Sequence, residues 1–182
     1  MPRRVETAAA SEDDRREYIA AMRASAGLHG EWITPPTTDE EFDDLLRRGE
    51  SDDFYGYVIR SLEDGGIVGA CNVSNIFRRN LRSAYVGYAA VAGYEGRGLM
   101  HEGVGLVLDE AFGPLGLHRI EANIQPDNEA SIALVRRLGF VREGYLEGYL
   151  RINGEWRDHE RWAIRSELWR REGRAANAPE RP

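Results

Sequence analysis

The stretch that decides the fold runs from residue 93 to residue 100 and reads Gly-Tyr-Glu-Gly-Arg-Gly-Leu-Met. A strand-like segment, 84–91, precedes it, and an apolar helical repeat begins at Leu99 and stops at Gly113-Pro114. Two glycines between a strand and a helix allow the backbone to approach a ligand closely, and the first helical turn offers unpaired N–H groups. With the helix dipole, this favours binding of an anion such as a pyrophosphate. A tight turn without a ligand is the alternative interpretation.

Two specific phosphate motifs are excluded by the residues around this loop. A dinucleotide-binding fingerprint requires a glycine where His101 stands, and it also requires an early strand–helix–strand unit. A phosphate-binding loop of the P-loop type requires a lysine, but all 24 basic residues are arginine. The absence of lysine also excludes Schiff-base chemistry.

The segments on either side of the loop predict a mixed sheet with helices packed on it. An α-rich opening is followed by an antiparallel meander and then by a strand–helix–strand–helix–strand order, so the fold class is α/β or α+β. A Thr38/Glu41 capping box starts one helix, and Asn153-Gly154 is the strongest hairpin signal. Strands are expected at 5–9, 54–60, 67–76, 84–91, 118–124, 140–146, 149–152 and 156–164, and helices at 11–25, 38–49, 99–112 and 130–138.

Composition bounds the class of protein. The chain has 182 residues, which predicts a single domain over 1–170, and the Arg-, Ala- and Pro-rich segment 171–182 predicts a flexible tail. The net charge of −7 disfavours a broad nucleic-acid-binding surface, and no apolar run approaches membrane-spanning length. Cys71 is the one cysteine, which favours a reducing compartment. A cytoplasmic protein with no membrane or direct nucleic-acid partner is expected.

Several short motifs occur in an order and spacing that resemble a known family. They are Val86-Gly87-Tyr88, Gly96-Arg97-Gly98-Leu99-Met100, Asn128 at a helix start, Gly139-Phe140 at its end, and Asn153-Gly154-Glu155-Trp156. Over residues 54–165 the chain resembles the GCN5-related N-acetyltransferase (GNAT) superfamily, most closely its Rim-type branch of ribosomal-protein-alanine N-acetyltransferases. The resemblance implies a mixed, mostly antiparallel sheet of about seven strands with a splayed strand pair, flanked by about four helices.

The resemblance also implies acetyl-CoA as co-substrate, inserted where strands 84–91 and 118–124 splay apart. The Val91 N–H is the expected donor to the oxyanion of the reaction, and the family's polar residue at the start of the loop falls on Gly93. No metal is expected, because the four histidines are scattered and no cysteine cluster accompanies them. The residues expected to contact acetyl-CoA are Ala89, Ala90, Val91, Gly96, Arg97, Gly98, Leu99, Met100, Asn128 and Ser131.

Three residues are candidates for proton transfer during attack of an amine on the thioester. Ser131 is the candidate proton donor to the thiol, although a first-turn serine can also simply bond its own backbone. The glutamate that a related enzyme carries on the strand after Gly-Phe falls on Leu150, so that base is absent or displaced. Glu147 is the first substitute for this base and His159 the second. Alternatively, Glu147 lies on a solvated strand face and His159 holds the hairpin against its neighbour. A chain of water molecules that carries the proton to bulk solvent is a third possibility.

Three aromatic residues are expected near the amine acceptor, namely Trp32, Tyr88 and Tyr149. Tyr85 and Tyr88 are predicted to point to the same strand face, and Gly87 between them suggests a bulge or a close backbone approach.

The function expected from these features is transfer of an acetyl group to a primary amine, most plausibly a protein N-terminus, by a monomer or homodimer. Two alternatives stay open. A small amine such as an antibiotic or polyamine would use a closed pocket, whereas a peptide would need an open groove. The displaced glutamate and Gly93 also allow a non-catalytic CoA-binding module.

Overall fold

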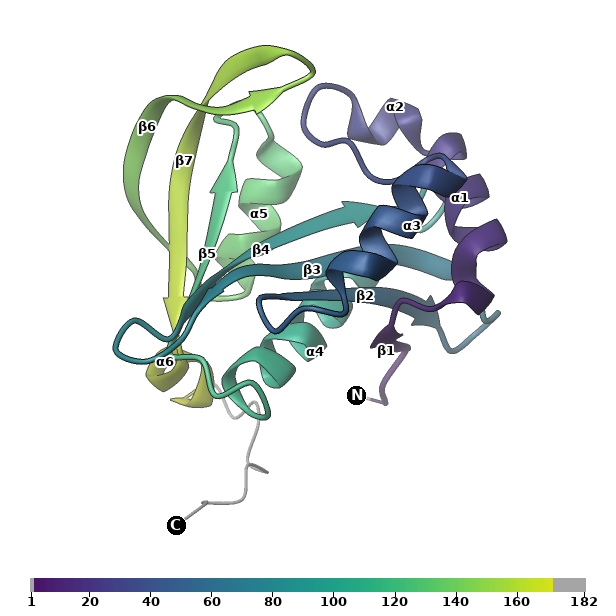
Figure 1. Ribbon diagram of the computed structural model, residues 1–182. Helices are drawn as coiled ribbons and strands as arrows, with labels where there is room; N and C mark the ends of the chain where they lie inside the picture. Colours follow the sequence, from purple (N-terminus) through teal and green to yellow (C-terminus); the bar gives the residue numbers. More distant parts are fainter. Residues whose placement is uncertain (1, 172–182) are drawn as a thin grey trace.

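One seven-stranded sheet organises the chain in the computed structural model, which describes residues 2–171 and side chains through Trp169 (Figure 1). The strand order is β1-β2-β3-β4-β5-β7-β6, and every neighbouring pair is antiparallel except β4 and β5. The predicted mixed, mostly antiparallel sheet is therefore confirmed. The strands are β1 (Val5–Ala9), β2 (Phe54–Ser61), β3 (Ile67–Phe77), β4 (Ser83–Ala90), β5 (Arg119–Ile124), β6 (Val141–Ile152) and β7 (Glu155–Arg165).

The described residues form six α-helices and one short 3-10 helix, more than the four helices expected. The two additional α-helices are short: α2 is a single turn, and α6 immediately follows the last strand. Beyond the end of α6, the predicted tail lies outside the described residues. None of these helices has the length and apolar content needed to cross a bilayer. The helices are η1 (Glu12–Asp14), α1 (Arg15–Ala24), α2 (Ala26–His29), α3 (Asp39–Arg48), α4 (Leu99–Phe112), α5 (Glu129–Arg137) and α6 (Ser166–Arg171).

Two local sequence signals form the structures that they predict. Thr38 Oγ1 accepts the Glu41 N–H at 3.2 Å, and the Glu41 carboxylate accepts the Thr38 N–H at 3.1 Å, so both halves of the capping box start α3. Asn153 and Gly154 take φ values of +50° and +85° and turn β6 into β7. The two strands predicted at 140–146 and 149–152 are a single strand, β6, whose pairing with β7 shifts register between Leu146 and Leu150.

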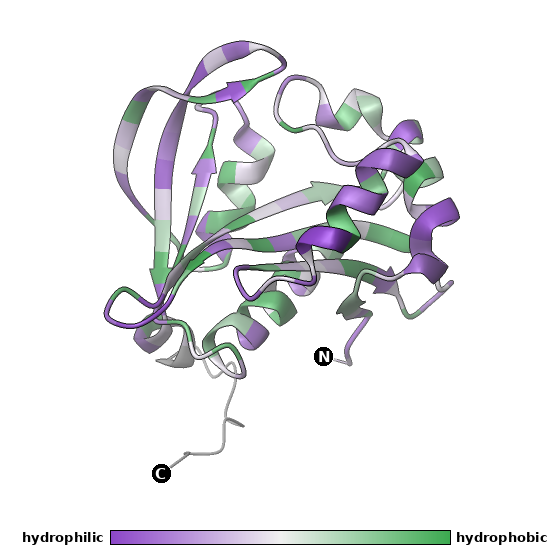
Figure 2. Cartoon of the chain, in the orientation of Figure 1, coloured by the Kyte–Doolittle hydropathy of each residue, from purple (hydrophilic) through white to green (hydrophobic). Residues whose placement is uncertain are grey.

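The sheet carries a hydrophobic core on each face. Val58 and Ile59 are adjacent on β2 yet pack into different cores, because successive strand side chains point to opposite faces. Figure 1 shows α4 on one face of β1–β3 and α1 with α3 on the other, and in Figure 2 these helices turn apolar residues toward the sheet. Two helical layers thus fix β3 and β4 in place.

The strand pair at the centre of the sheet separates along most of its length. β4 pairs with β3 as far as Ala90, but it pairs with β5 only from Ser83 to Tyr85, opposite Arg119–Glu121. After Tyr85 the two strands diverge, as Figure 1 shows. The predicted splayed strand pair is confirmed, and it opens the sheet beside the start of α4.

Candidate active site

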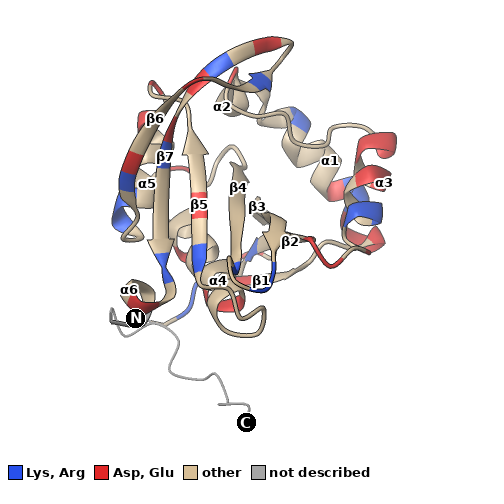
Figure 3. Ribbon diagram, turned by 60° about the vertical axis from the view of Figure 1, so that its left-hand side comes forward, with Lys and Arg blue, Asp and Glu red and all other residues tan. Residues whose placement is uncertain are grey.

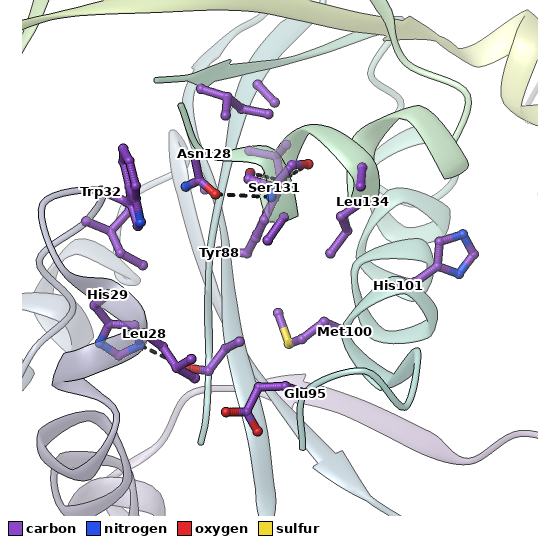
Figure 4. A pocket seen from close by; sticks show the side chains of 18 of the residues that line it. Leu28, His29, Trp32, Tyr88, Glu95, Met100, His101, Asn128, Ser131 and Leu134 are labelled. Carbon is purple, nitrogen blue, oxygen red and sulfur yellow. Dashed lines mark hydrogen bonds between the residues drawn. The ribbon is translucent and has the colours of Figure 1, made fainter. Parts of the chain in front are cut away.

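A cleft of about 520 Å³ occupies the gap between β4 and β5 (Figure 4). Its wall combines the end of α2 and the segment after it, the second half of β4, the loop before α4, the start of α4, the end of β5, one side of α5 and His159 of β7. Ten of the residues singled out in the sequence line it: Trp32, Tyr88, Ala90, Val91, Gly96, Gly98, Met100, Asn128, Ser131 and His159. Five others do not line it: Ala89, Arg97, Leu99, Glu147 and Tyr149.

Along the edge of β4 that faces the cleft, only alternate residues direct their backbone N–H and C=O groups into it. The Val91 N–H donates to the Val68 carbonyl of β3 at 2.8 Å, so the expectation that this amide serves the oxyanion is wrong. In an antiparallel ladder, neighbouring residues direct their N–H and C=O groups to opposite sides. The Ala90 carbonyl indeed points away from β3 and lies 2.8 Å from Nε2 of His29. The amides that face the gap are therefore those of Tyr88 and Ala90, while Ala89 is buried in the second core.

The loop before α4 presents amide groups to the cleft. Gly98 caps the helix with a φ of +74°, and the Glu102 N–H bonds to the Gly98 carbonyl at 3.2 Å. The amides of the first turn precede that bond and have no acceptor within the helix. Arg4 holds the loop from behind, because it donates to the Arg97 carbonyl at 2.9 Å and to the Glu102 carboxylate at 3.0 Å. Glu102 thus makes a structural bond, and Leu99 is buried in the main core.

The two charged side chains of this loop, Arg97 and Glu95, take different positions, and Arg97 is not at the cofactor site where it is predicted. The Arg97 guanidinium pairs with Glu63 and lies 5.7 Å from the centre of the Tyr94 ring, outside the cleft. Glu95, rather than Gly93, lines the cleft, and its carboxylate accepts the Gly93 N–H at 2.5 Å. Figure 4 shows Glu95 at the lower end of the cleft. A negative charge therefore stands beside the predicted anion site.

Because Glu95 would repel a pyrophosphate, we expect Glu95→Gln to lower the dissociation constant of acetyl-CoA about three- to tenfold at low salt. Glutamine keeps the acceptor oxygen that holds Gly93 and removes only the charge. Titration calorimetry at 50 and 500 mM salt measures the effect, which shrinks as salt screens the repulsion. An unchanged affinity at both salt concentrations would show that Glu95 does not face the anion.

A pair of hydroxyl groups lies on the helical side of the cleft. Asn128 caps α5 by accepting the Ser131 N–H at 3.1 Å, which leaves the Asn128 amide nitrogen able to donate to a ligand. The Ser131 Oγ lies 2.6 Å from the Tyr88 hydroxyl. Burial raises the pKa of Tyr88 well above its ordinary value, so the hydroxyl stays protonated at neutral pH. In Figure 4 these three residues converge on one wall of the cleft.

The prediction that Tyr85 and Tyr88 share a strand face is wrong, because residues three apart on a strand point to opposite faces. Tyr85 lies on the far face, where its hydrogen bond to Tyr149 raises the pKa of Tyr85 to about 12. The predicted bulge is also absent at Gly87, since the pairing of β4 with β3 is continuous there. Gly87 instead lines the cleft, and a Cβ atom at this position would have no other atom within 4 Å.

The two candidate bases differ in their surroundings. His159 is buried and lines the cleft, whereas Glu147 is exposed in the irregular part of β6 and does not. The His159 Nδ1 lies 2.9 Å from the Arg157 carbonyl oxygen. That nitrogen must carry the proton, which leaves Nε2 as an acceptor. Burial lowers the pKa of His159 below 6.5, so the imidazole is neutral at pH 7.

The segment between α2 and α3 borders the cleft opposite α5. Trp32 lines the cleft, and Figure 4 shows it across the opening from Ser131. Its neighbour Glu31 accepts a bond from the Gln125 side chain through its carbonyl at 2.8 Å and pairs with Arg157 at 3.1 Å. This segment is therefore tied to the ends of β5 and β7. Tyr149 lies beside the cleft, its ring 6.1 Å from the His159 ring.

Sequence reasoning missed several residues of the cleft, including His29, Gln125 and Asn123. The first two act through contacts with residues 61 and 94 positions away, for which the local sequence carries no signal. The Asn123 Oδ1 is buried without a hydrogen-bond partner. Over residues 2–171, no group of three or more His, Cys, Asp or Glu side chains is placed to hold a metal ion.

A cleft between splayed parallel strands, beside helix-start amides that have no acceptor within the helix, has the shape and polarity that suit an extended ligand carrying an anionic group. The family model of the acetyltransferase (GNAT) domain matches residues 4–141, and the chain belongs to this family.

Relatives within the family differ in what they acetylate. The [Ribosomal protein uS5]-alanine N-acetyltransferase of Escherichia coli is 39% identical over 103 residues, which cover 57% of this chain and 53% of that protein. The spermidine N(1)-acetyltransferase of the same organism is 30% identical over 102 residues, 56% of this chain and 53% of that protein. The matched part of the chain thus spans about half the length of these relatives. The solved structure of Mycobacterium smegmatis RimJ in complex with CoA-disulfide superposes with a TM-score of 0.79 at 26% identity, covering 93% and 90% of the two chains.

Proposed function

We propose that this protein is an acetyl-CoA-dependent N-acetyltransferase that acts on the free amino group of a protein N-terminus. The observation that carries the proposal is the loss of β5 from the edge of β4 after Tyr85, next to the uncapped amides of α4. That edge offers the Ala90 N–H to an amide carbonyl of a pantetheine arm and, farther from the loop, the Tyr88 N–H to the thioester. The amides that follow Gly98 lie where the pyrophosphate next to the pantetheine arm would bind. The residues present therefore fit acetyl-CoA.

Residues on two sides of the cleft take part in the reaction: His159 acts on the amine, and Ser131 acts on the sulfur. The amine attacks the thioester carbonyl carbon, so a C–N bond forms while the C–S bond breaks and its electron pair goes to sulfur. His159 Nε2 takes the amine proton, and the Tyr88 N–H donates to the oxyanion. Ser131 donates a hydrogen bond to the departing sulfur. CoA thiolate, whose pKa resembles the ordinary thiol value near 8.5, takes its proton from water on release.

The charges of the cleft favour an N-terminus over a polyamine. A polyamine carries several ammonium groups, which are held best by several carboxylates. Among the described residues that line the cleft, Glu95 supplies the one carboxylate, and it belongs to the cofactor loop. Figure 3 shows a concentration of acidic residues on α3 instead, and no residue of α3 lines the cleft. A single neutral amine suits this environment.

An acceptor screen tests the proposal. Purified protein and acetyl-CoA are mixed with peptides that begin with Ala, Ser or Met, with the same peptides blocked at the N-terminus, or with spermidine, and the released CoA thiol is measured. We expect turnover with free N-termini and none with blocked ones. Cys71 is buried and contributes little to the thiol signal. Turnover restricted to spermidine would replace the proposed acceptor, and CoA binding without any turnover would favour a non-catalytic module.

A further inference from the structure

We propose that Tyr88 is a positioning residue for acetyl transfer, whose hydroxyl donates to Ser131 Oγ and so directs the Ser131 proton toward the leaving sulfur. This inference rests on the proposed function and adds a residue to it. The sequence had assigned Tyr88 to the acceptor, but the structure places its hydroxyl 2.6 Å from Ser131, across 43 residues of sequence. The pair joins the splayed edge of β4 to the first turn of α5.

The number of hydroxyl protons determines what the direction of the Tyr88–Ser131 hydrogen bond means for the reaction. Each hydroxyl has one proton to donate. If Ser131 donated to Tyr88, it would have none left for the sulfur, whereas donation by Tyr88 leaves the Ser131 proton free to point into the cleft. The Ser131 carbonyl oxygen, 3.4 Å from the Tyr88 hydroxyl, can only accept, whereas the 2.6 Å contact with Ser131 Oγ allows either hydroxyl to donate, and the inference takes Tyr88 as its donor.

The surroundings of the pair fix it in this arrangement. The Ser131 N–H is already directed to the Asn128 side chain at 3.1 Å, which holds the serine backbone. Tyr88 is half-buried, and this contact gives its hydroxyl a partner, because an unpaired hydroxyl removed from water is costly. Its high pKa means that it keeps its proton through the reaction. Tyr88 therefore orients Ser131, and no proton leaves the tyrosine.

The test is a double-mutant cycle with Tyr88→Phe and Ser131→Ala, measured with a peptide acceptor. Phenylalanine keeps the ring and removes only the hydroxyl, so we expect kcat to fall about three- to tenfold with the KM for acetyl-CoA unchanged. Because Tyr88 acts through Ser131, adding Tyr88→Phe to Ser131→Ala should cost less than twofold more. Tyr85→Phe is the matched control, since it removes a hydroxyl from the opposite face of the same strand.

Each outcome has a distinct meaning. Equal losses from Tyr88→Phe with and without Ser131 would overturn the inference and give Tyr88 an independent role. A raised KM for acetyl-CoA at unchanged kcat would also overturn it and leave Tyr88 as part of the cleft wall. In both cases the active wild-type enzyme upholds the proposed function. A wild-type protein inactive on every amine would overturn the function and the inference together. CoA binding by calorimetry verifies that each variant is folded.

Discussion

Replacing Gly98 with valine is expected to weaken acetyl-CoA binding by at least about 100-fold. Gly98 has a φ of +74°, which a β-branched residue adopts only with strain. Relief of that strain would turn the amides at the start of α4 away from the cleft and remove both the hydrogen bonds and the dipole that suit a pyrophosphate. Titration calorimetry with CoA measures the loss.

Gly116→Val is the matched control for this experiment. Gly116 also has a positive φ, +63°, and a Cβ on either glycine would lie 3.6 Å from an arginine Nη2, that of Arg82 for Gly116 and that of Arg4 for Gly98. Gly116 follows α4 and does not line the cleft. We expect similar losses of thermal stability from both substitutions but unchanged CoA affinity for Gly116→Val. Retained affinity in Gly98→Val would refute the anion site.

Replacing His159 with asparagine is expected to lower kcat by about 100-fold, the scale of general base catalysis, without changing acetyl-CoA affinity. Asparagine can still donate to the Arg157 carbonyl in place of Nδ1, but it provides no base where Nε2 stood. Glu147→Gln serves as the control, and we expect it to match the wild type. Full activity in His159→Asn together with a loss in Glu147→Gln would reverse the assignment.

The pH profile of the same pair provides an independent check. The neutral imidazole is the active form, and burial lowers its pKa below 6.5, so the wild-type rate should fall only as the pH drops below that value. The acceptor amine titrates in both reactions and cancels in the ratio of wild-type to variant rates. We expect this ratio to be constant above pH 6.5 and to decrease below it. A decrease that begins above pH 6.5 would contradict a buried, neutral His159 as the base.

Local sequence signals predicted the framework of the fold. The Thr38 capping box, the Asn153-Gly154 turn and the glycines before Leu99 each depend on residues within a few positions of one another, and each forms as expected. The family resemblance added the splay of β4 from β5, which no local pattern encodes. The additional helices α2 and α6 are too short to show a clear period.

The parts of the site that could not be predicted depend on contacts distant in sequence. Arg97 is drawn out of the cleft by Glu63, 34 residues earlier, and the Val91 amide is used by β3. The order of the two base candidates followed from the nearness of Glu147 to Leu150, where the glutamate of the related enzyme falls, but exposure separates them, because Glu147 is exposed and His159 is buried. Pairing of Tyr88 with Ser131 requires β4 and α5 to meet.

The divergence of β4 from β5 gives the sheet an inner pair of unpaired edges, a feature that in other settings invites aggregation through strand addition by another chain. Here α5 and the segment around Trp32 flank the opening, and His29 already occupies the Ala90 carbonyl. The proposed pantetheine arm would bind along this edge as an added strand does, so the cofactor would occupy an edge with which another chain could otherwise pair.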